Sequence, residues 1–306
     1  MQTILGAGGD IGTPLAKELR RYTDKVRLVA RNPKKVNQDD ELFAANLLDE
    51  KNVIQALENT DIAYLTVGLS YDYKIWEKQW PVIIQNVIKA CLTHGTKLVF
   101  LDNVYAYSEK EIGNMHEDSQ INPPSKKGKI RGQLIKKLHE AEKNSGLKLI
   151  IAKSADFYGP DAKNGILNLL VIDNFKKGKK AQWQSDTTKI HSFTYTIDAA
   201  KGLALLGNTA SAYGQNWHLP TSSERLNGKQ FIELVATELN TKPRYTLLSS
   251  FMLRLAGLFS KTIKELIEMQ YQNDRDYFFN SEKFVKEFNF TPTTYKQGIK
   301  EILKTS

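Results

Sequence analysis

A cluster of four glycines near the N-terminus constrains this chain more than any other feature. Residues 6–12 read Gly-Ala-Gly-Gly-Asp-Ile-Gly; they follow the apolar run 3–5 and lead into a helical pattern that begins at Ile11. Glycines at this spacing permit a tight turn, close approach of the backbone to a pyrophosphate, and close packing of helix on strand. The helix start offers N–H groups without partners and the positive end of its dipole. The alternative is a glycine-rich turn without a ligand, but the order strand, glycines, helix predicts a dinucleotide-binding turn at Gly6, Gly8, Gly9, Asp10, Ile11 and Gly12.

The rest of the N-terminal half alternates strand-like and helix-like segments. Continuous apolar runs occur at 3–5, 26–29, 62–65, 97–101 and 147–151. Between them apolar residues recur with helical spacing, for example at Ile84, Val87, Ile88 and Cys91. Continuous apolar strands that alternate with helices are typical of a parallel sheet covered on both faces. We therefore predict an α/β fold with a Rossmann-like, doubly wound parallel sheet.

The C-terminal half is less regular and predicts a smaller lobe. After Pro160 we expect a strand at 192–197 and helices at 164–175, at 198–206 with Asp198 as N-cap, and near 228–240, 249–258, 261–272 and 294–304. The stretch 108–125 shows no clear element, which is typical of a functional or mobile loop. We assign 1–157 to the dinucleotide-binding domain, with 187–210 returning to it, and 158–186 and 211–306 to a smaller C-terminal substrate-binding lobe.

Composition excludes several classes of protein. The 43 Lys and Arg outnumber 34 Asp and Glu, for a net charge of +9, but they are scattered along the chain, so we expect a solvated basic surface and no nucleic-acid partner. Cys91 is the single cysteine, which excludes a disulfide framework and a multi-cysteine zinc site, and we predict no metal.

No apolar run approaches the roughly 18 residues that span a membrane. The first strand-like run leaves no room for a signal peptide, so we expect a cytoplasmic protein without membrane contact.

The end of the second strand-like run indicates which dinucleotide is bound. An NAD site uses a carboxylate at this end, about 20 residues after the glycines, to bind the ribose 2′-hydroxyl. Asp24 precedes the run, whereas Arg31 and Asn32 follow it. Because a guanidinium suits a 2′-phosphate, we predict NADP(H) in preference to NAD(H). Asn46 is a further cofactor candidate that would contact the adenine; the alternative is that it is a plain turn residue. Thr66, Val67 and Gly68, which follow the run 62–65, are the remaining cofactor candidates.

Four segments resemble those of a known family. They are the glycine cluster, 100–107 (Phe-Leu-Asp-Asn-Val-Tyr-Ala-Tyr), 157–160 (Phe-Tyr-Gly-Pro) and 193–198 (Phe-Thr-Tyr-Thr-Ile-Asp). With them the chain resembles, over essentially its full length, the extended short-chain dehydrogenases/reductases of the NAD-dependent epimerase/dehydratase group. The resemblance implies a Rossmann domain with a smaller C-terminal lobe, a small-molecule substrate bound between them, and a homodimer formed through two helices of the Rossmann domain.

The chain departs from that family at the catalytic positions. Members carry a Ser or Thr after the fifth strand and a Tyr-x-x-x-Lys on the next helix; the corresponding positions are Asn103, Lys127 and Arg131, as in atypical members. In one interpretation Lys127 is the proton donor or electrostatic partner of a substrate carbonyl, while Arg131 binds ribose or an anionic group. Asn103 then donates its amide to a developing oxyanion. In the other interpretation Lys127 and Arg131 belong to a solvated basic helix start, and the protein binds a dinucleotide without chemistry.

Four residues are weaker candidates for substrate contact. Asp156 falls where the family keeps a substrate-facing polar residue, although an aspartate there also suits a turn cap. His191 and Tyr195 flank the strand that returns to the sheet, and a lone histidine there is more often a packed residue than a catalyst. Tyr107 ends the segment after the fifth strand-like run.

Three functions from different classes follow. The leading prediction is an NADP(H)-dependent oxidoreductase that acts on a small carbonyl or hydroxyl substrate. The second is a non-catalytic dinucleotide sensor like the NmrA-type regulators, which signal through a protein partner. The third is a nucleotide-sugar epimerase or dehydratase, which the whole-chain resemblance favours and the missing tyrosine opposes.

Overall fold

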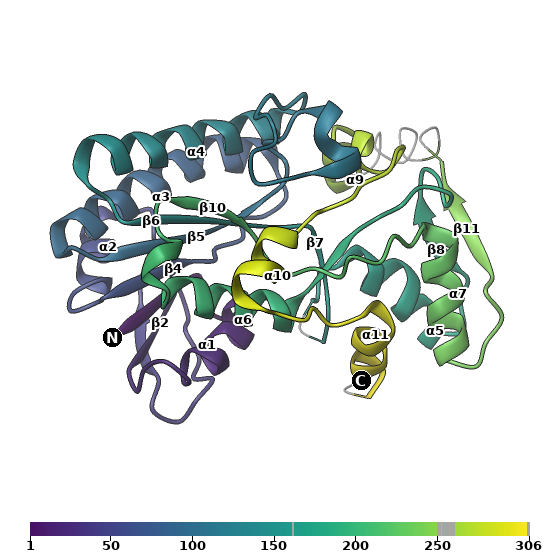
Figure 1. The fold of residues 1–306 in the computed structure, drawn as a ribbon, viewed down its shortest axis with the longest axis horizontal. Coiled ribbons are helices and arrows are strands. Elements are labelled where there is room, and N and C mark those ends of the chain that lie inside the picture. The colour runs from purple at the N-terminus through teal and green to yellow at the C-terminus, as the bar shows by residue number, and fades with distance from the viewer. Residues whose placement is uncertain (161, 250–251, 253–260, 305–306) are drawn as a thin grey trace.

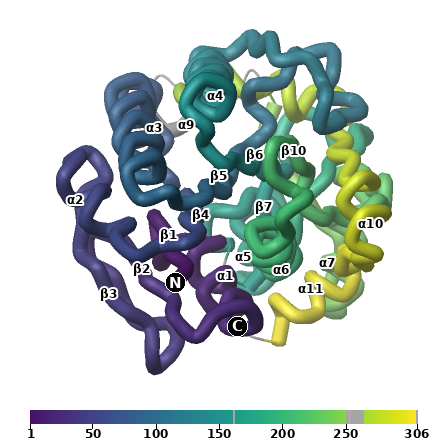
Figure 2. Tube along the Cα trace, turned by 60° about the vertical axis from the view of Figure 1, so that its left-hand side comes forward, coloured from purple at the N-terminus to yellow at the C-terminus, as the bar shows by residue number. Residues whose placement is uncertain are grey.

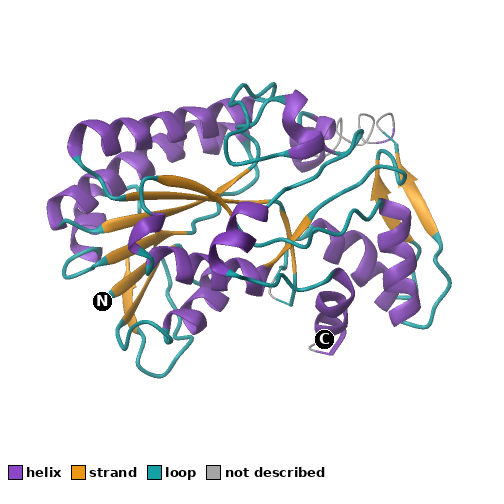
Figure 3. Ribbon diagram, viewed as in Figure 1, coloured by secondary structure: helices purple, strands orange, loops and turns teal. Residues whose placement is uncertain are grey.

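The core of the protein is a parallel sheet of seven strands. The computed structural model describes residues 1–160, 162–249, 252 and 261–304. The strands lie in the order β10-β6-β5-β4-β1-β2-β3, and all neighbours are parallel (Figure 1; Figure 3). Their bounds are β1 Gln2–Leu5, β2 Val26–Ala30, β3 Glu41–Ala44, β4 Ile62–Leu65, β5 Lys97–Asn103, β6 Leu149–Ser154 and β10 Gln215–His218. This arrangement confirms the predicted doubly wound parallel sheet.

Helices cover both faces of this sheet (Figure 2). One face packs against α1 (Gly12–Leu19) and α6 (Thr196–Gly207), and the other against α2 (Glu50–Ala56), α3 (Tyr73–His94) and α4 (Lys126–Ser145). Because both faces are covered, strands are apolar at successive positions; all four residues of β1 and of β4 are buried. The strands end together at one edge, which we call the carboxyl edge. Open parallel sheets bind their ligands at this edge.

A smaller lobe follows the sixth strand and has its own core, as predicted. Its elements are β7 Asp156–Tyr158 paired with β9 Phe193–Tyr195, a π-helical turn η2 Asn168–Ile172 that continues as α5 Asp173–Lys176, β8 Ala181–Gln184 paired with β11 Tyr245–Leu248, α7 Gly228–Glu238 and α11 Tyr295–Lys304. Aromatic rings fill its core: Phe231 packs edge-on against Tyr295 at 4.7 Å and stacks on Trp183 at 6.1 Å. The remaining elements are η1 Glu109–Asn114, η3 Ala210–Ala212, α9 Lys261–Ile267, η4 Gln270–Gln272 and α10 Glu282–Phe288.

The structure differs from the expectations at several points. The division into domains stays a prediction, but the segment 215–218, expected in the lobe, forms β10 of the main sheet, where Trp217 packs into the core beside α6. Asp198 is not the N-cap of α6: that helix begins at Thr196, and Asp198 in its first turn accepts a hydrogen bond from the N–H of Thr293 at 2.6 Å. The helix expected at 249–258 lies outside the described residues, apart from positions 249 and 252.

The stretch 108–125, expected as a loop, is attached to the rest of the fold. It contains the short helix η1, in which Ile112 is fully buried. Met115 is also buried and forms a bridge with Phe279. These apolar contacts fix the segment beside the end of β5.

Candidate functional site

The glycine turn is shaped to receive a phosphate group. Gly6 has φ +98°, and a Cβ there would lie 2.6 Å from the backbone nitrogen of Val67, so Thr66 and Val67 pass directly beside the turn. At Gly8 a Cβ would meet no described atom within 4 Å, and at Gly9 the nearest lies 3.8 Å away. The residue before α1, Ile11, forms no side-chain capping hydrogen bond. An open surface at the start of a helix fits a pyrophosphate.

Arg31 lies at the edge where an adenosine would bind. It follows β2 directly and is exposed, as is Asn32, whereas Asp24 precedes the strand. Asn46 lies on the neighbouring segment after β3, close to Arg31 because the N–H of Ala45 donates to the carbonyl of Ala30 at 2.9 Å. Its side chain accepts from the N–H of Leu48, as a turn residue does. The carboxyl end of β2 thus presents a cation in the position that the sequence predicts.

Lys127 is bound by two glutamates that no sequence motif indicates. Its side chain is fully buried at the start of α4, and its ammonium donates to the carboxylates of Glu265 and Glu268 and, at 3.3 Å, to the Glu265 carbonyl. An ammonium has three donors, and these three acceptors use them all. Glu265 also accepts from the N–H of Tyr73, and Glu268 from that of Lys126, both at 3.0 Å. Lys127 therefore does not lie on a solvated helix face.

Arg131 is also buried, in a cluster of three charges with Asp102 and Lys153. Its Nε donates to Asp102 at 2.6 Å, and Lys153 binds the other oxygen of that carboxylate. None of the three is more than 3% exposed. Burial alone would raise the pKa of Asp102, but the two cations outweigh it and lower that pKa. A charged residue directly after the apolar run of each strand, at the paired positions 102 and 153, was the signal that could have identified this cluster.

Asn103 ends β5 beside two tyrosines. Its side-chain oxygen accepts from the N–H of Tyr105 at 3.0 Å. The Tyr105 hydroxyl lies 3.4 Å from that of Tyr71, and the ring of Tyr71 lies 4.5 Å from the ammonium of Lys127. The carboxyl edge thus brings Asn103 and Lys127, two of the three predicted catalytic residues, to the same group of tyrosines.

The predicted substrate residues separate into two groups. Asp156 and His191 meet: Nε2 of His191 lies 2.9 Å from a carboxylate oxygen of Asp156, whose side chain is 28% exposed. The other two are internal and lie apart, in separate apolar clusters: Tyr107 and Tyr195 are at most 3% exposed. The hydroxyl of Tyr107 lies 2.7 Å from Nε2 of His218, and burial lowers the pKa of this histidine to about 3. Burial leaves Tyr107 and Tyr195 out of reach of a substrate in this structure.

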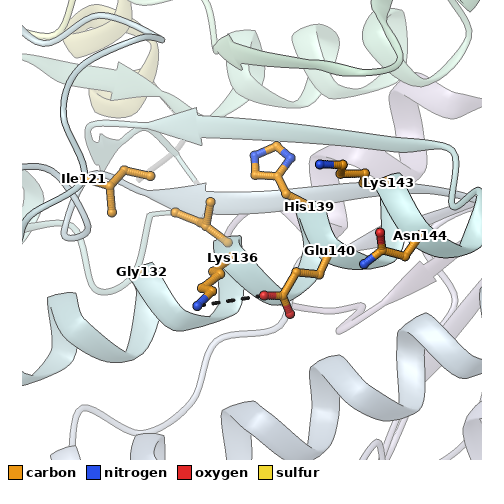
Figure 4. Close-up of a pocket in the computed structure, with 8 residues that line it drawn as sticks. Ile121, Gly132, Lys136, His139, Glu140, Lys143 and Asn144 are labelled. Carbon is orange, nitrogen blue, oxygen red and sulfur yellow. Dashed lines mark ion pairs between the residues drawn. The ribbon is translucent and has the colours of Figure 1, made fainter.

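One hollow of the structure lies away from this edge, on the outer face of α4 (Figure 4). Its volume is about 570 Å³, and its lining residues include Ile121, Ile135 and His139. Two of the lining residues, Lys136 and Glu140, form a surface ion pair at 3.9 Å. The hollow contains none of the predicted site residues, so we place the candidate site at the carboxyl edge by its chemistry.

The described residues form no helix long and apolar enough to cross a membrane, and no group of three or more His, Cys, Asp or Glu side chains that could bind a metal ion.

An open glycine turn at the edge of a seven-stranded parallel sheet defines a nucleotide-binding protein of the Rossmann class. Residues 3–218 match the NAD dependent epimerase/dehydratase family, and the chain belongs to this family. No curated protein matches it.

Solved structures share the fold at low sequence identity. The UDP-glucuronic acid 4-epimerase of Bacillus cereus, in complex with UDP-glucuronic acid and NAD, is 16% identical, with a TM-score of 0.80 and coverage of 100% of both chains. The UDP-glucose 4-epimerase of Thermus thermophilus, in complex with NAD, is 16% identical, with a TM-score of 0.77 and coverage of 100% of this chain and 98% of that one. A dTDP-glucose 4,6-dehydratase of Streptomyces venezuelae is 14% identical, with a TM-score of 0.80 and coverage of 100% and 96%.

Proposed function

We propose that this protein binds a nicotinamide dinucleotide along the carboxyl edge and is an oxidoreductase that acts on a carbonyl or hydroxyl carbon. The observation that carries the proposal is the open glycine turn at the start of α1, with Gly8 and Gly9 facing unfilled space. When bound, a nicotinamide supplies the acceptor or donor of a hydride. Nucleotide sugars are the first substrates to test, because epimerases and dehydratases named for them share the fold. The experiment is a titration with dinucleotide followed by an assay of UDP-glucose oxidation.

We further propose that NADP(H) is preferred. The support for this preference is Arg31, which is exposed at the end of β2. The names of the family and of the solved structures mention NAD and do not add to it. In Arg31→Ala we expect the Kd for NADPH to rise about 10- to 100-fold, the equivalent of one lost charge-assisted hydrogen bond. The Kd for NADH should stay unchanged in a fluorescence titration. Arg21→Ala, which removes an exposed arginine that pairs with Glu18 on α1, is the control; equal affinity of the native protein for both dinucleotides contradicts the preference.

Lys127 is proposed as an electrostatic partner of the substrate oxygen. Its three donors are engaged by α9 and the residue that follows it, so its charge acts through the ring of Tyr71, over which the ammonium lies and whose hydroxyl donates to that of Tyr105. We expect Lys127→Met to lower kcat about 100-fold, as the loss of a preorganised charge near the reacting oxygen does. The NADPH affinity should remain within twofold. Lys129→Met, an exposed position on the same helix turn, is the control, and an unchanged kcat in Lys127→Met rules the role out.

One observation favours the sensor as the second candidate. Lys127 and Arg131 replace the family's tyrosine and lysine, and both are bound to carboxylates within the protein. A protein that binds NADPH and turns over no substrate would be this sensor. The cytoplasmic location and the homodimer remain proposals; light scattering tests the second.

A further inference from the structure

Asp156 lies where a substrate at the carboxyl edge would be. It is the first residue of β7, two positions beyond the end of β6, and Ser154 at that end pairs with Asn103 of β5. Burial raises the pKa of Tyr71, Tyr105 and Tyr277, and the negative charge of Asp156 nearby raises each further. Asp156 thus belongs to the group of polar side chains that converge at this edge.

His191 fixes the orientation of Asp156. The histidine ring is only 4% exposed and stacks on Tyr277 with centroids 4.3 Å apart, while Phe193 packs against it at 4.6 Å. Its Nε2 binds one oxygen of Asp156 at 2.9 Å. The His191 ring is held rigidly, and the Asp156 carboxylate in front of it keeps part of its surface exposed. This arrangement suits proton transfer by Asp156.

The other ionisable groups at this edge are poorly suited to accept a proton. Lys127 uses all three donors on Glu265 and Glu268, and those carboxylates are engaged with it in turn. Arg131 is bound to Asp102 and stays protonated.

The tyrosines at the edge act in another way. With raised pKa values, Tyr71 and Tyr105 stay neutral and serve as hydrogen-bond donors rather than bases. The Asp156 side chain keeps 28% of its surface exposed, and it pairs with His191 rather than with a lysine or arginine.

We propose that Asp156, positioned by His191, exchanges the substrate proton in place of the tyrosine that α4 lacks. The inference rests on the proposed oxidoreductase function. In the direction of alcohol oxidation, the substrate O–H bond breaks and its proton passes to Asp156. The C–H bond would break with its hydrogen and electron pair passing together, as hydride, to a bound nicotinamide, and the carbon would become a carbonyl. Tyr105 donates to the substrate oxygen, and in the reverse direction Asp156 returns the proton.

The test compares Asp156→Asn with the native protein. The probes are UDP-glucose with NADP⁺ and, in the other direction, 9,10-phenanthrenequinone with NADPH. We expect kcat to fall at least about 100-fold, the usual contribution of general acid–base catalysis, while the Kd for NADPH and the denaturation curve stay as in the native protein. The limb of the pH–rate profile that reports the base should disappear. Asp156→Glu should recover part of the rate.

His191→Gln tests the positioning role. We expect a fall in kcat of about 10-fold and a displaced limb in the pH–rate profile, with KM unchanged. A second readout needs neither dinucleotide nor turnover: the ring-proton NMR resonance of His191 should shift in Asp156→Asn. The matched control is Glu142→Gln, which breaks a surface carboxylate–histidine pair with His139 at 3.0 Å on α4 and should change neither rate nor the His191 resonance.

The outcomes separate the inference from the function on which it rests. Turnover that survives Asp156→Asn with more than a third of its rate overturns the proton-transfer role alone. Binding of NADPH without turnover of either probe overturns that role and the oxidoreductase together, and leaves the sensor. A native protein that binds no dinucleotide overturns the proposed function and the inference with it.

Discussion

Asp102→Asn is expected to lower the free energy of unfolding by about 3–5 kcal/mol, as does the loss of one partner from a buried ion pair. The carboxylate of Asp102 is the shared counter-charge of Arg131 and Lys153, and all three side chains are almost wholly buried. Asparagine has the same shape but no charge. Two cations would then remain in the interior without the anion that compensates their desolvation.

Urea denaturation of the two proteins at pH 7 measures this loss. Asp61→Asn is the control: its carboxylate pairs with the N-terminal ammonium at the surface and is 77% exposed, so we expect a loss of no more than about 1 kcal/mol. The pKa of Asp102 is lowered by folding, so its stabilisation is present above the ordinary aspartate pKa. It is lost as the pH falls from that value through the lower pKa of Asp102 in the folded protein. A loss as small as that of Asp61→Asn would show that the cluster contributes little.

Gly6→Ala is expected to abolish dinucleotide binding and to destabilise the fold. At φ +98° an alanine is strained by about 1 kcal/mol or more. Its Cβ would also lie 2.6 Å from the backbone nitrogen of Val67, which no side-chain rotation relieves. Either the turn or the end of β4 must move, and both border the phosphate position. We expect no detectable quenching of NADPH fluorescence and a stability loss of several kcal/mol, about the size of a severe core mutation.

Gly214→Ala separates strain from collision. Gly214 has a similar φ of +80°, but no described atom lies within 4 Å of its Cβ position, and it precedes β10 rather than the glycine turn. We expect a loss of only about 1 kcal/mol there and an unchanged Kd for NADPH. If Gly6→Ala binds NADPH as the native protein does, the dinucleotide is not bound at this turn.

The replaced catalytic positions have a physical consequence for the site. In place of a tyrosine and a lysine, the start of α4 carries two cations, and each has acquired acidic partners from elsewhere in the chain: Glu265 and Glu268 for Lys127, and the buried Asp102 for Arg131. A buried charge without such partners would be costly. The cations are thereby withdrawn from proton transfer, which leaves Asp156 as the base that we propose.

Much of the fold could be predicted because its signals are local. The glycine turn requires only residues that adjoin in sequence, and the runs at 26–29, 62–65 and 97–101 each reappear as a strand with ends shifted by at most two residues. The strand β10 was missed because it is short and begins with two polar residues. Gln215–His218 therefore has no pattern that separates it from a loop. Their pairing with β6 supplies the hydrogen bonds that make them a strand.

The site was predictable only in part, for the opposite reason. Nothing near Lys127 in the sequence indicates Glu265 or Glu268, which lie 138 and 141 positions away. Asp156 and His191 were both candidates, but that they form a pair depends on β7 lying beside β9. Tyr107 and Tyr195 were candidates for the same edge, and packing placed them inside.

The amino-acid order alone determined the parallel sheet, the glycine turn and the positions where the usual tyrosine and lysine are absent. Each of these depends on spacing along the chain, and spacing acts through the local backbone geometry of strands, turns and helices. Only the tertiary structure decided which charges meet. Charges are compensated by whatever group the folded chain places within a few ångströms, and those groups come from segments that the sequence separates by tens to more than a hundred residues.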